Sequence, residues 1–285
     1  MAAFTVAVTQ MSCTWDIEAN IGKAEALVRK AADAGANVVL LPELFATPYF
    51  CKDKSEEYFA LAAPATDNPL LERMAALARA THTVLPVSFF EKDGDLHYNS
   101  IAMFDADGAC LGLYRKSHIP DGPGYWEKFY FAPGNTGFRV WKTAYGAIGV
   151  GICWDQWFPE AARAMTLFGA SVILYPTAIG SEPLNPTLDT QPLWQRVMQG
   201  NAMANMIPIA ASNRVGVEEG STCTTSFYGS SFITDAFGEM QVQASRSEET
   251  ILIACIDPEE NARLRADWGF FRDRRPEQYG SLLAK

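Results

Sequence analysis

A nine-residue pattern that occurs twice in this chain constrains its fold more than any other feature. Residues 34–42 read AGANVVLLP and residues 168–176 read FGASVILYP, 134 positions later. In each copy a helical stretch ends at a glycine, and a small residue leads into four large apolar residues closed by proline. Continuous apolar runs of this kind are typical of strands buried on both faces. The pattern predicts two related helix-to-strand units whose sheets can pack face to face, although any helix, glycine, strand connection could produce such a match.

The rest of the chain mixes strands and helices from end to end. Apolar residues recur every three or four positions after Asn20, which predicts a helix that Gly35 ends, and two Asp-Gly turns predict a hairpin-rich meander over 83–115. Further strands are predicted at 4–8, 147–153, 207–212, 230–234 and 251–256, and further helices at 68–80, after Pro159 and at 194–205. No Ser, Pro or Gly-rich linker interrupts the chain, so we expect a single domain over 1–285.

Composition excludes several classes of protein. The 285 residues carry 17 Phe, 10 Tyr and 7 Trp, too many for a disordered chain. A net charge of −10 without any basic run argues against binding to nucleic acid or to an anionic membrane. The start of the chain lacks the features of a signal peptide, and the six cysteines form no CxxC pair, so we expect a cytoplasmic protein with free thiols. The three histidines are isolated, and no metal site is predicted.

Cys153 is the first candidate for chemistry. It follows the apolar run AIGVGI and precedes a turn and a predicted helix. A thiol between a strand end and a helix N-terminus meets backbone N–H groups that favour a thiolate and can bind an oxyanion. The alternative is a buried structural cysteine, which is the commoner role of this residue.

Two other ionisable residues also follow predicted strands. Glu43 comes directly after ANVVLLP, and Lys116 comes after CLGLYR and before a Pro/Gly-rich loop. Three strand ends can bring a thiol, a carboxylate and an ammonium group together, whereas a Cys-His pair has little support because His118 is the only histidine in a suitable loop. Solvated loop positions are the alternative for both Glu43 and Lys116.

Three motif blocks resemble the nitrilase superfamily of carbon–nitrogen hydrolases. They are PELF at 42–45, YRKSHIPDGPGYWEKFYFAPGNTGF at 114–138 and GVGICWDQWFPEAARAM at 149–165, and the resemblance extends from Phe4 to about Tyr279. Within the superfamily, YPTAIGSEP, WQRVMQGNAMAN and ASNRVG resemble the branch of N-carbamoylputrescine amidohydrolases, which act in polyamine biosynthesis.

The resemblance implies an α/β fold, a four-layer αββα sandwich, and a Glu-Lys-Cys triad. Motif matching assigns the triad to Glu43, Lys116 and Cys153, and a further family glutamate to Glu127, which would orient Lys116 or assist proton transfer. It implies no cofactor, and it implies a homo-oligomer in which the C-terminal segment 257–285 is a contact region.

The implied substrate is a small cationic ureido compound, so its ammonium end needs an anionic or aromatic partner. We expect Glu182 to be that carboxylate, with Asp121 and Asp155 as competing candidates, and Tyr49, Tyr125 and Trp154 as wall residues. The alternatives are an ω-amidase or a carbamoyl amidohydrolase for β-amino acids, whose substrates end in a carboxylate and call for Arg or Lys. A non-catalytic binding protein with the same fold is a third interpretation, and a thiol redox sensor is a fourth.

Overall fold

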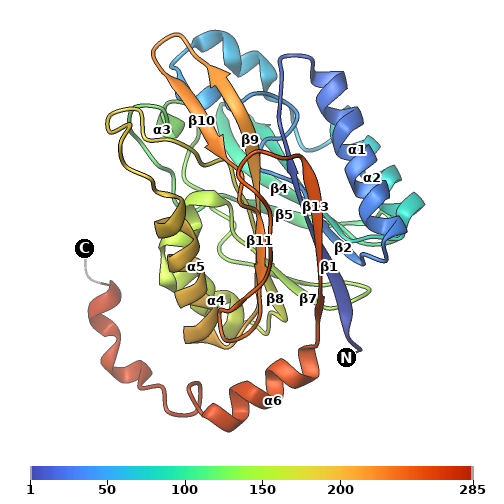
Figure 1. The fold of residues 1–285 in the computed structure, drawn as a ribbon, viewed down its shortest axis with the longest axis vertical. Helices are drawn as coiled ribbons and strands as arrows, with labels where there is room; N and C mark the ends of the chain where they lie inside the picture. The colour runs from blue at the N-terminus through green and yellow to red at the C-terminus, as the bar shows by residue number, and fades with distance from the viewer. Residues whose placement is uncertain (1, 284–285) are drawn as a thin grey trace.

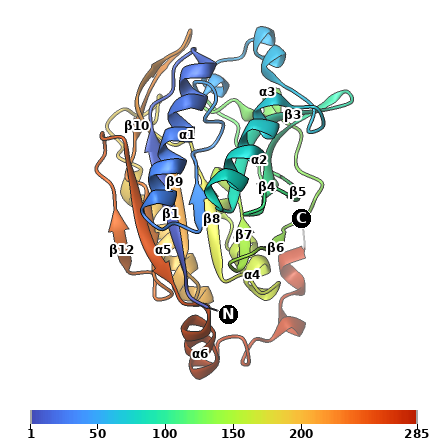
Figure 2. The same ribbon diagram turned by 90° about the vertical axis from the view of Figure 1, so that its right-hand side faces the viewer.

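Two β-sheets pack face to face, and helices cover both outer sides. The computed structural model describes residues 2–283. Helices α1 (Ile17–Asp33) and α2 (Pro69–Thr81) lie on one side of the strands, and α4 (Pro159–Leu167) and α5 (Gln191–Asn205) lie on the opposite side (Figure 1). Turned by 90°, the molecule shows α1 and α2 side by side across their sheet (Figure 2). The predicted four-layer αββα sandwich is confirmed.

The sheet under α1 and α2 is built around β1. Strand β1 pairs in parallel with β2 and antiparallel with β13. Strands β3, β4 and β5 form an antiparallel meander, which joins β2 through a single bridge between Val38 and Val84. These strands are β1 (Phe4–Met11), β2 (Val38–Leu40), β3 (Leu85–Asp93), β4 (Leu96–Phe104), β5 (Cys110–Arg115) and β13 (Thr250–Ile256). The predicted meander is therefore present.

The sheet under α4 and α5 has three parallel central strands, β7, β8 and β9, with antiparallel strands outside them. Its strands are β6 (Val140–Lys142), β7 (Ala147–Val150), β8 (Val172–Pro176), β9 (Ile209–Glu219), β10 (Thr224–Tyr228), β11 (Phe232–Thr234) and β12 (Met240–Gln243). The end of β1 pairs with β9 at Gln10 and Met11, so the two sheets are joined at one edge.

Successive side chains of β2 and of β8 point alternately into the core between the two sheets and into the core between a sheet and its helices. On β2, Val38 and Leu40 pack between the sheets, whereas Val39 packs against α1 and α2. On β8, Val172 and Leu174 enter the same inter-sheet core, whereas Ile173 and Tyr175 face α4 and α5. Because both faces of these strands are covered, their sequences show continuous apolar runs rather than alternation.

The two predicted helix-to-strand units have the same geometry. Gly35 after α1 and Gly169 after α4 have φ of 93° and 90°, in the left-handed region that favours glycine. Beyond the strands the two units meet, because the backbone N–H of Glu43 donates to the carbonyl of Thr177 at 3.3 Å. The repeat therefore positions the segment that carries Glu43.

Several predicted boundaries were wrong. The first helix begins at Ile17 instead of Asn20, because the Asp16 side chain accepts from the N–H of Ala19 and caps it. The strand predicted at 147–153 ends at Val150, and β9 continues to Glu219 instead of stopping at 212. Strands β6, β10 and β12 were not predicted, since most of their residues are polar or half-exposed edge positions.

The C-terminal part of the chain forms an arm beyond the sandwich. Helix α6 (Pro258–Trp268) runs along the lower end of the molecule, and the two 3₁₀ turns that follow it curve up on the side of α4 and α5 (Figure 1). Pro258 is the buried residue of α6, whereas Trp268 and Leu283 are 50% and 88% exposed. The predicted contact segment 257–285 coincides with this arm, apart from its last two residues, which lie outside the described part of the chain.

The six cysteines, all within residues 2–283, form no disulfide bond, as the sequence predicted. All six are free, and Cys110 and Cys255 are exposed. No helix within residues 2–283 is both long and apolar enough to span a membrane.

Candidate active site

The structure brings Glu43, Lys116, Glu127 and Cys153 together at the end of the inter-sheet core. Glu43 follows β2, Lys116 follows β5, Glu127 begins the short helix α3 (Glu127–Tyr130), and Cys153 begins a 3₁₀ turn over Cys153–Trp157. All four side chains are buried, three of them almost completely, with Cys153 at 5% exposure. The convergence predicted from three strand ends is therefore present.

Lys116 lies between the two carboxylates. Its Nζ donates to Glu43 Oε1 at 2.9 Å and to Glu127 at 2.9 Å and 2.7 Å. Burial acts to lower the pKa of Lys116, but the two carboxylates outweigh it and hold that pKa well above its usual value. Lys116 is thus a permanent cation inside the site.

One of the two carboxylate oxygens of Glu43 receives no hydrogen bond from residues 2–283. Its Oε1 accepts from Lys116 and from Asn99 Nδ2, the latter at 2.6 Å, whereas no group among the described residues donates to Oε2. A buried carboxylate oxygen without a donor can accept a proton from an incoming group. Sequence reasoning missed Asn99, although the polar pair Asn99 and Ser100 directly before the apolar run IAMF of β4 was a usable signal.

Glu127 is held by Lys116 and by Tyr49, whose hydroxyl donates to Oε1 at 2.6 Å. Burial raises the pKa of Glu127 to about 7, although Lys116 lowers it. Tyr49 itself was predicted as a wall residue, and this was wrong. Its side chain is completely buried behind Tyr125, with the ring centroids 5.9 Å apart, because its hydroxyl finds a carboxylate partner there.

Cys153 occupies a strained turn. Its φ is 38°, which is unusual for a residue other than glycine and costs about 1–3 kcal/mol. Burial raises the pKa of the Cys153 thiol well above its usual value, and Glu43 raises it further, while Lys116 and the backbone N–H of Ala178 act to lower it. Desolvation and the nearby Glu43 carboxylate therefore outweigh the groups that favour a thiolate.

Asp155 holds the turn that carries Cys153. Its Oδ2 accepts from the N–H of Ile152 at 2.8 Å and from the Tyr114 hydroxyl at 2.7 Å. Its Oδ1 accepts from the His118 N–H at 3.0 Å. Asp155 is fully buried and does not line the cavity beside Cys153, so it is excluded as a partner for a substrate ammonium group.

A cavity of about 280 Å³ opens above Cys153. Its lining includes Tyr125 and Trp154, two of the predicted wall residues, and the two remaining carboxylate candidates, Glu182 and Asp121. Burial raises the pKa of Glu182, while a hydrogen bond from Thr190 lowers it. No Lys, Arg or His is among the described residues that line this cavity, so its titratable groups are Cys153, Tyr125 and two carboxylates.

Comparison with known proteins identifies the family. The carbon–nitrogen hydrolase family model matches residues 5–266. The chain belongs to the carbon–nitrogen hydrolase family. This hydrolase is 54% identical to an N-carbamoylputrescine amidase of Solanum tuberosum, over 98% of this chain and 94% of the relative.

Two further relatives extend the comparison. A citrullinase of Francisella tularensis is 52% identical over the full length of both chains. The crystal structure of a carbon–nitrogen hydrolase from Helicobacter pylori superposes with a TM-score of 0.92 at 38% identity, over 99% of each chain. The carbon–nitrogen hydrolase described here therefore shares fold and length with these relatives, and the two enzymes named for a substrate are named for different ones.

Proposed function

We propose that this carbon–nitrogen hydrolase converts N-carbamoylputrescine and water to putrescine, ammonia and carbon dioxide, a step of polyamine biosynthesis. The observation that carries the proposal is the cavity above Cys153, which offers Glu182 and Asp121 but no described cationic side chain. A substrate with a ureido group at one end and an ammonium group at the other matches this distribution of charge. The names of relatives at 52–54% identity support the same class of substrate.

The mechanism begins with the transfer of a proton. As the Cys153 sulfur attacks the ureido carbon, Glu43 Oε2 takes the thiol proton, and the carbonyl electrons move to the oxygen. Lys116 and the backbone N–H of Trp154 stabilise the resulting oxyanion. A ureido carbonyl is a poor electrophile because two nitrogens donate electrons into it, so this stabilisation is essential.

The intermediate then collapses. Glu43 returns the proton to the departing nitrogen, the C–N bond breaks, and a thiocarbamoyl group remains on Cys153. Water attacks that carbonyl carbon while Glu43 accepts its proton, and the C–S bond breaks as the thiol is restored. The carbamate that is released loses carbon dioxide. Glu127 keeps Lys116 oriented throughout, with its own carboxylate fixed by Tyr49.

A second candidate substrate is citrulline, favoured by the name of the Francisella relative. Citrulline carries the same ureido group, but its other end bears a carboxylate besides the ammonium group. The described lining of the cavity has no Lys, Arg or His to neutralise that carboxylate, and Glu182 and Asp121 would repel it. The charge of the cavity therefore favours the diamine derivative.

The experiment is a measurement of ammonia release by the wild-type protein and by Cys153→Ala. We expect N-carbamoylputrescine to be hydrolysed much faster than citrulline, carbamoyl-β-alanine or a simple ω-amide, and we expect Cys153→Ala to be inactive toward all of them. A preference for any substrate that ends in a carboxylate would overturn the proposed specificity. Full activity of Cys153→Ala would overturn the mechanism.

A further inference from the structure

Arg214 is a completely buried arginine on β9 that the mechanism does not use. Its guanidinium lies under the segment that carries the proposed base. Nη2 donates to the backbone carbonyls of Glu43 at 2.9 Å and Leu44 at 2.7 Å, and Nη1 donates to the carbonyl of Thr47 at 2.8 Å. One side chain therefore fixes three carbonyls within five residues, starting at Glu43.

Glu218, four residues along the same strand, completes the arrangement. Its Oε1 accepts from Arg214 Nη1 at 3.0 Å, and its Oε2 accepts from the backbone N–H of Tyr49 at 2.6 Å. Tyr49 is the residue whose hydroxyl donates to Glu127. Arg214 and Glu218 both lie on β9. Arg214 thus fixes the backbone at Glu43, and Glu218 fixes the backbone at Tyr49, which supports Glu127.

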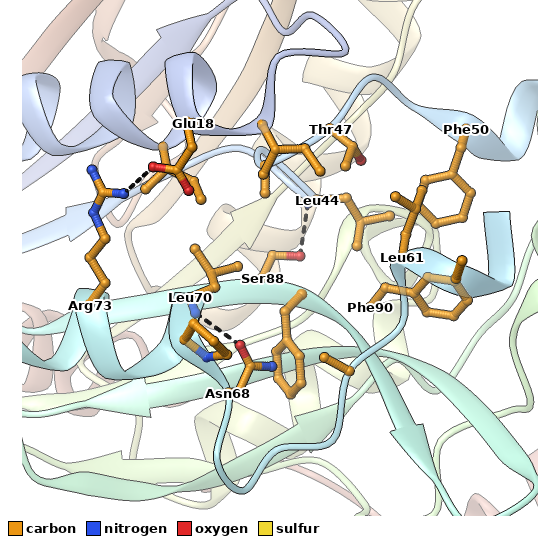
Figure 3. Close-up of a pocket in the computed structure, with 17 residues that line it drawn as sticks. Glu18, Leu44, Thr47, Phe50, Leu61, Asn68, Leu70, Arg73, Ser88 and Phe90 are labelled. Carbon is orange, nitrogen blue, oxygen red and sulfur yellow. Dashed lines mark hydrogen bonds and ion pairs between the residues drawn. The ribbon is translucent and has the colours of Figure 1, made fainter.

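Part of the opposite side of this segment borders a cavity. Leu44, Thr47 and Phe50 form one wall of a cavity of about 400 Å³, and Ser88 Oγ accepts from the N–H of Leu44 at 2.9 Å (Figure 3). Leu44 has a φ of 50°, in the left-handed region. A segment with a strained backbone that borders a cavity depends on its hydrogen bonds to keep its geometry.

We propose that Arg214 and Glu218 are positioning residues, which hold the segment 43–49 so that Glu43 and the Tyr49–Glu127 pair meet Lys116. The proposal rests on the assignment of Glu43 as the base under the proposed function. The planar guanidinium is needed because it donates in several fixed directions at once, whereas a lysine in its place keeps the charge but not the fork. Displacement of a catalytic group by about 1 Å can cost on the order of 100-fold in rate.

The test compares Arg214→Lys with a matched control, Arg265→Lys. Arg265, on α6, also donates to two backbone carbonyls, those of Asn205 and Met206 at the C-terminal end of α5. We expect Arg214→Lys to lower kcat by on the order of 100-fold with little change in KM, because the cavity above Cys153 is untouched. We expect Arg265→Lys to keep the wild-type kcat. An unchanged kcat in Arg214→Lys, or equal losses in the two variants, would overturn the proposal.

A substrate-independent readout separates this proposal from the proposed function. The rate at which iodoacetamide alkylates Cys153 is measured against pH by mass spectrometry. Because the Glu43 carboxylate raises the pKa of Cys153, its displacement in Arg214→Lys should move the alkylation curve to lower pH. If the alkylation curve of Arg214→Lys shifts but the wild-type protein does not hydrolyse N-carbamoylputrescine, the proposed function is wrong and the positioning role still holds.

Glu218→Gln provides a second variant if Arg214→Lys does not fold. The amide retains the size of the side chain but offers one acceptor oxygen to two donors, Arg214 and the Tyr49 N–H. We expect a smaller loss of kcat, again without a change in KM, and an alkylation curve shifted in the same direction. A folded Glu218→Gln with the wild-type kcat and the wild-type alkylation curve would contradict the proposal.

Discussion

Cys153 shows how a single residue depends on its surroundings. Its sulfur is buried, its backbone φ is positive, and burial and the Glu43 carboxylate both raise the pKa of its thiol. A neutral resting thiol needs a base at the moment of attack, and Glu43 Oε2 has no competing donor among the described residues. In the proposed mechanism Cys153 and Glu43 therefore act as a pair, with Glu43 accepting the thiol proton during the attack.

Glu43→Gln should separate the two effects of this carboxylate. We expect hydrolysis to fall by at least about 100-fold, since the proposed general base is lost. We expect alkylation of Cys153 by iodoacetamide at neutral pH to become faster, because removal of the anion lowers the pKa of the thiol. The exposed Cys110 in the same sample serves as the internal control. Slower alkylation of the variant would contradict the electrostatic explanation.

Glu182→Gln tests the recognition of the ammonium group. Loss of one charge-assisted hydrogen bond corresponds to about 1.5–3 kcal/mol, so KM for N-carbamoylputrescine should rise by about 10- to 100-fold with little change in kcat. Burial raises the pKa of Glu182, so the wild-type KM should also rise as the pH falls through that pKa and the carboxyl becomes neutral. The variant should lack this rise.

Steady-state kinetics over a pH series provides the measurement, with Asp121→Asn at the exposed mouth as the comparison. A KM of Glu182→Gln equal to the wild-type value, together with a large effect of Asp121→Asn, would transfer the role to Asp121.

At the scale of elements, the turn after β7 determines where the thiol points. Asp155 ties this turn to the Tyr114 hydroxyl on β5 and to the loop that follows Lys116. The carboxylate thus couples the elements that carry Cys153 and Lys116. Its role depends on two acceptor oxygens, because both sides of the carboxylate face donors.

Asp155→Asn should disturb this coupling. The amide nitrogen of Asn is a donor, and it would replace one of the two oxygens that now accept hydrogen bonds. Because at least one of those donors would lose its acceptor, we expect a loss of about 1–3 kcal/mol in the free energy of unfolding and a reduced kcat. Urea denaturation and kinetics check both effects. Asp105→Asn is the control, since Asp105 accepts from the N–H groups of Ala106 and Ala144 in a remote turn, and it should leave kcat unchanged. A normal kcat in Asp155→Asn would show that the turn holds without the carboxylate.

At the scale of the whole molecule, the C-terminal arm extends beyond the sandwich and exposes large apolar side chains. Trp268, Leu282 and Leu283 are 50%, 64% and 88% exposed in the isolated chain. Apolar residues gathered on an extended segment are typical of contacts between subunits. The proposed homo-oligomer would bury this arm against another copy.

Leu282→Asp with Leu283→Asp should weaken that assembly. Light scattering during size exclusion should give a mass above the 31.3 kDa of one chain for the wild type, and a mass closer to one chain for the double variant. Leu96→Asp, at the exposed end of the β3–β4 hairpin, should behave as the wild type. A wild-type mass of one chain would disprove the oligomer, and an unaffected double variant would place the interface elsewhere.

Local patterns in the sequence determined the units of this fold and the residue types of its site. The two apolar runs, each with a glycine before it and a proline after it, predicted β2 and β8, because a strand covered on both faces needs apolar residues at every position. Glu43, Lys116 and Cys153 were found because each follows an apolar strand, and Glu127 was found through the resemblance to known motifs.

The tertiary structure alone decided how these groups are charged, supported and enclosed. Hydrogen bonds between residues far apart in the chain assigned Tyr49 to Glu127, Asp155 to the turn of Cys153, and Arg214 to the backbone at Glu43. Desolvation likewise depends on what surrounds a group in space, which is why the raised pKa of the Cys153 thiol follows from its burial beside Glu43 and not from its position in the sequence.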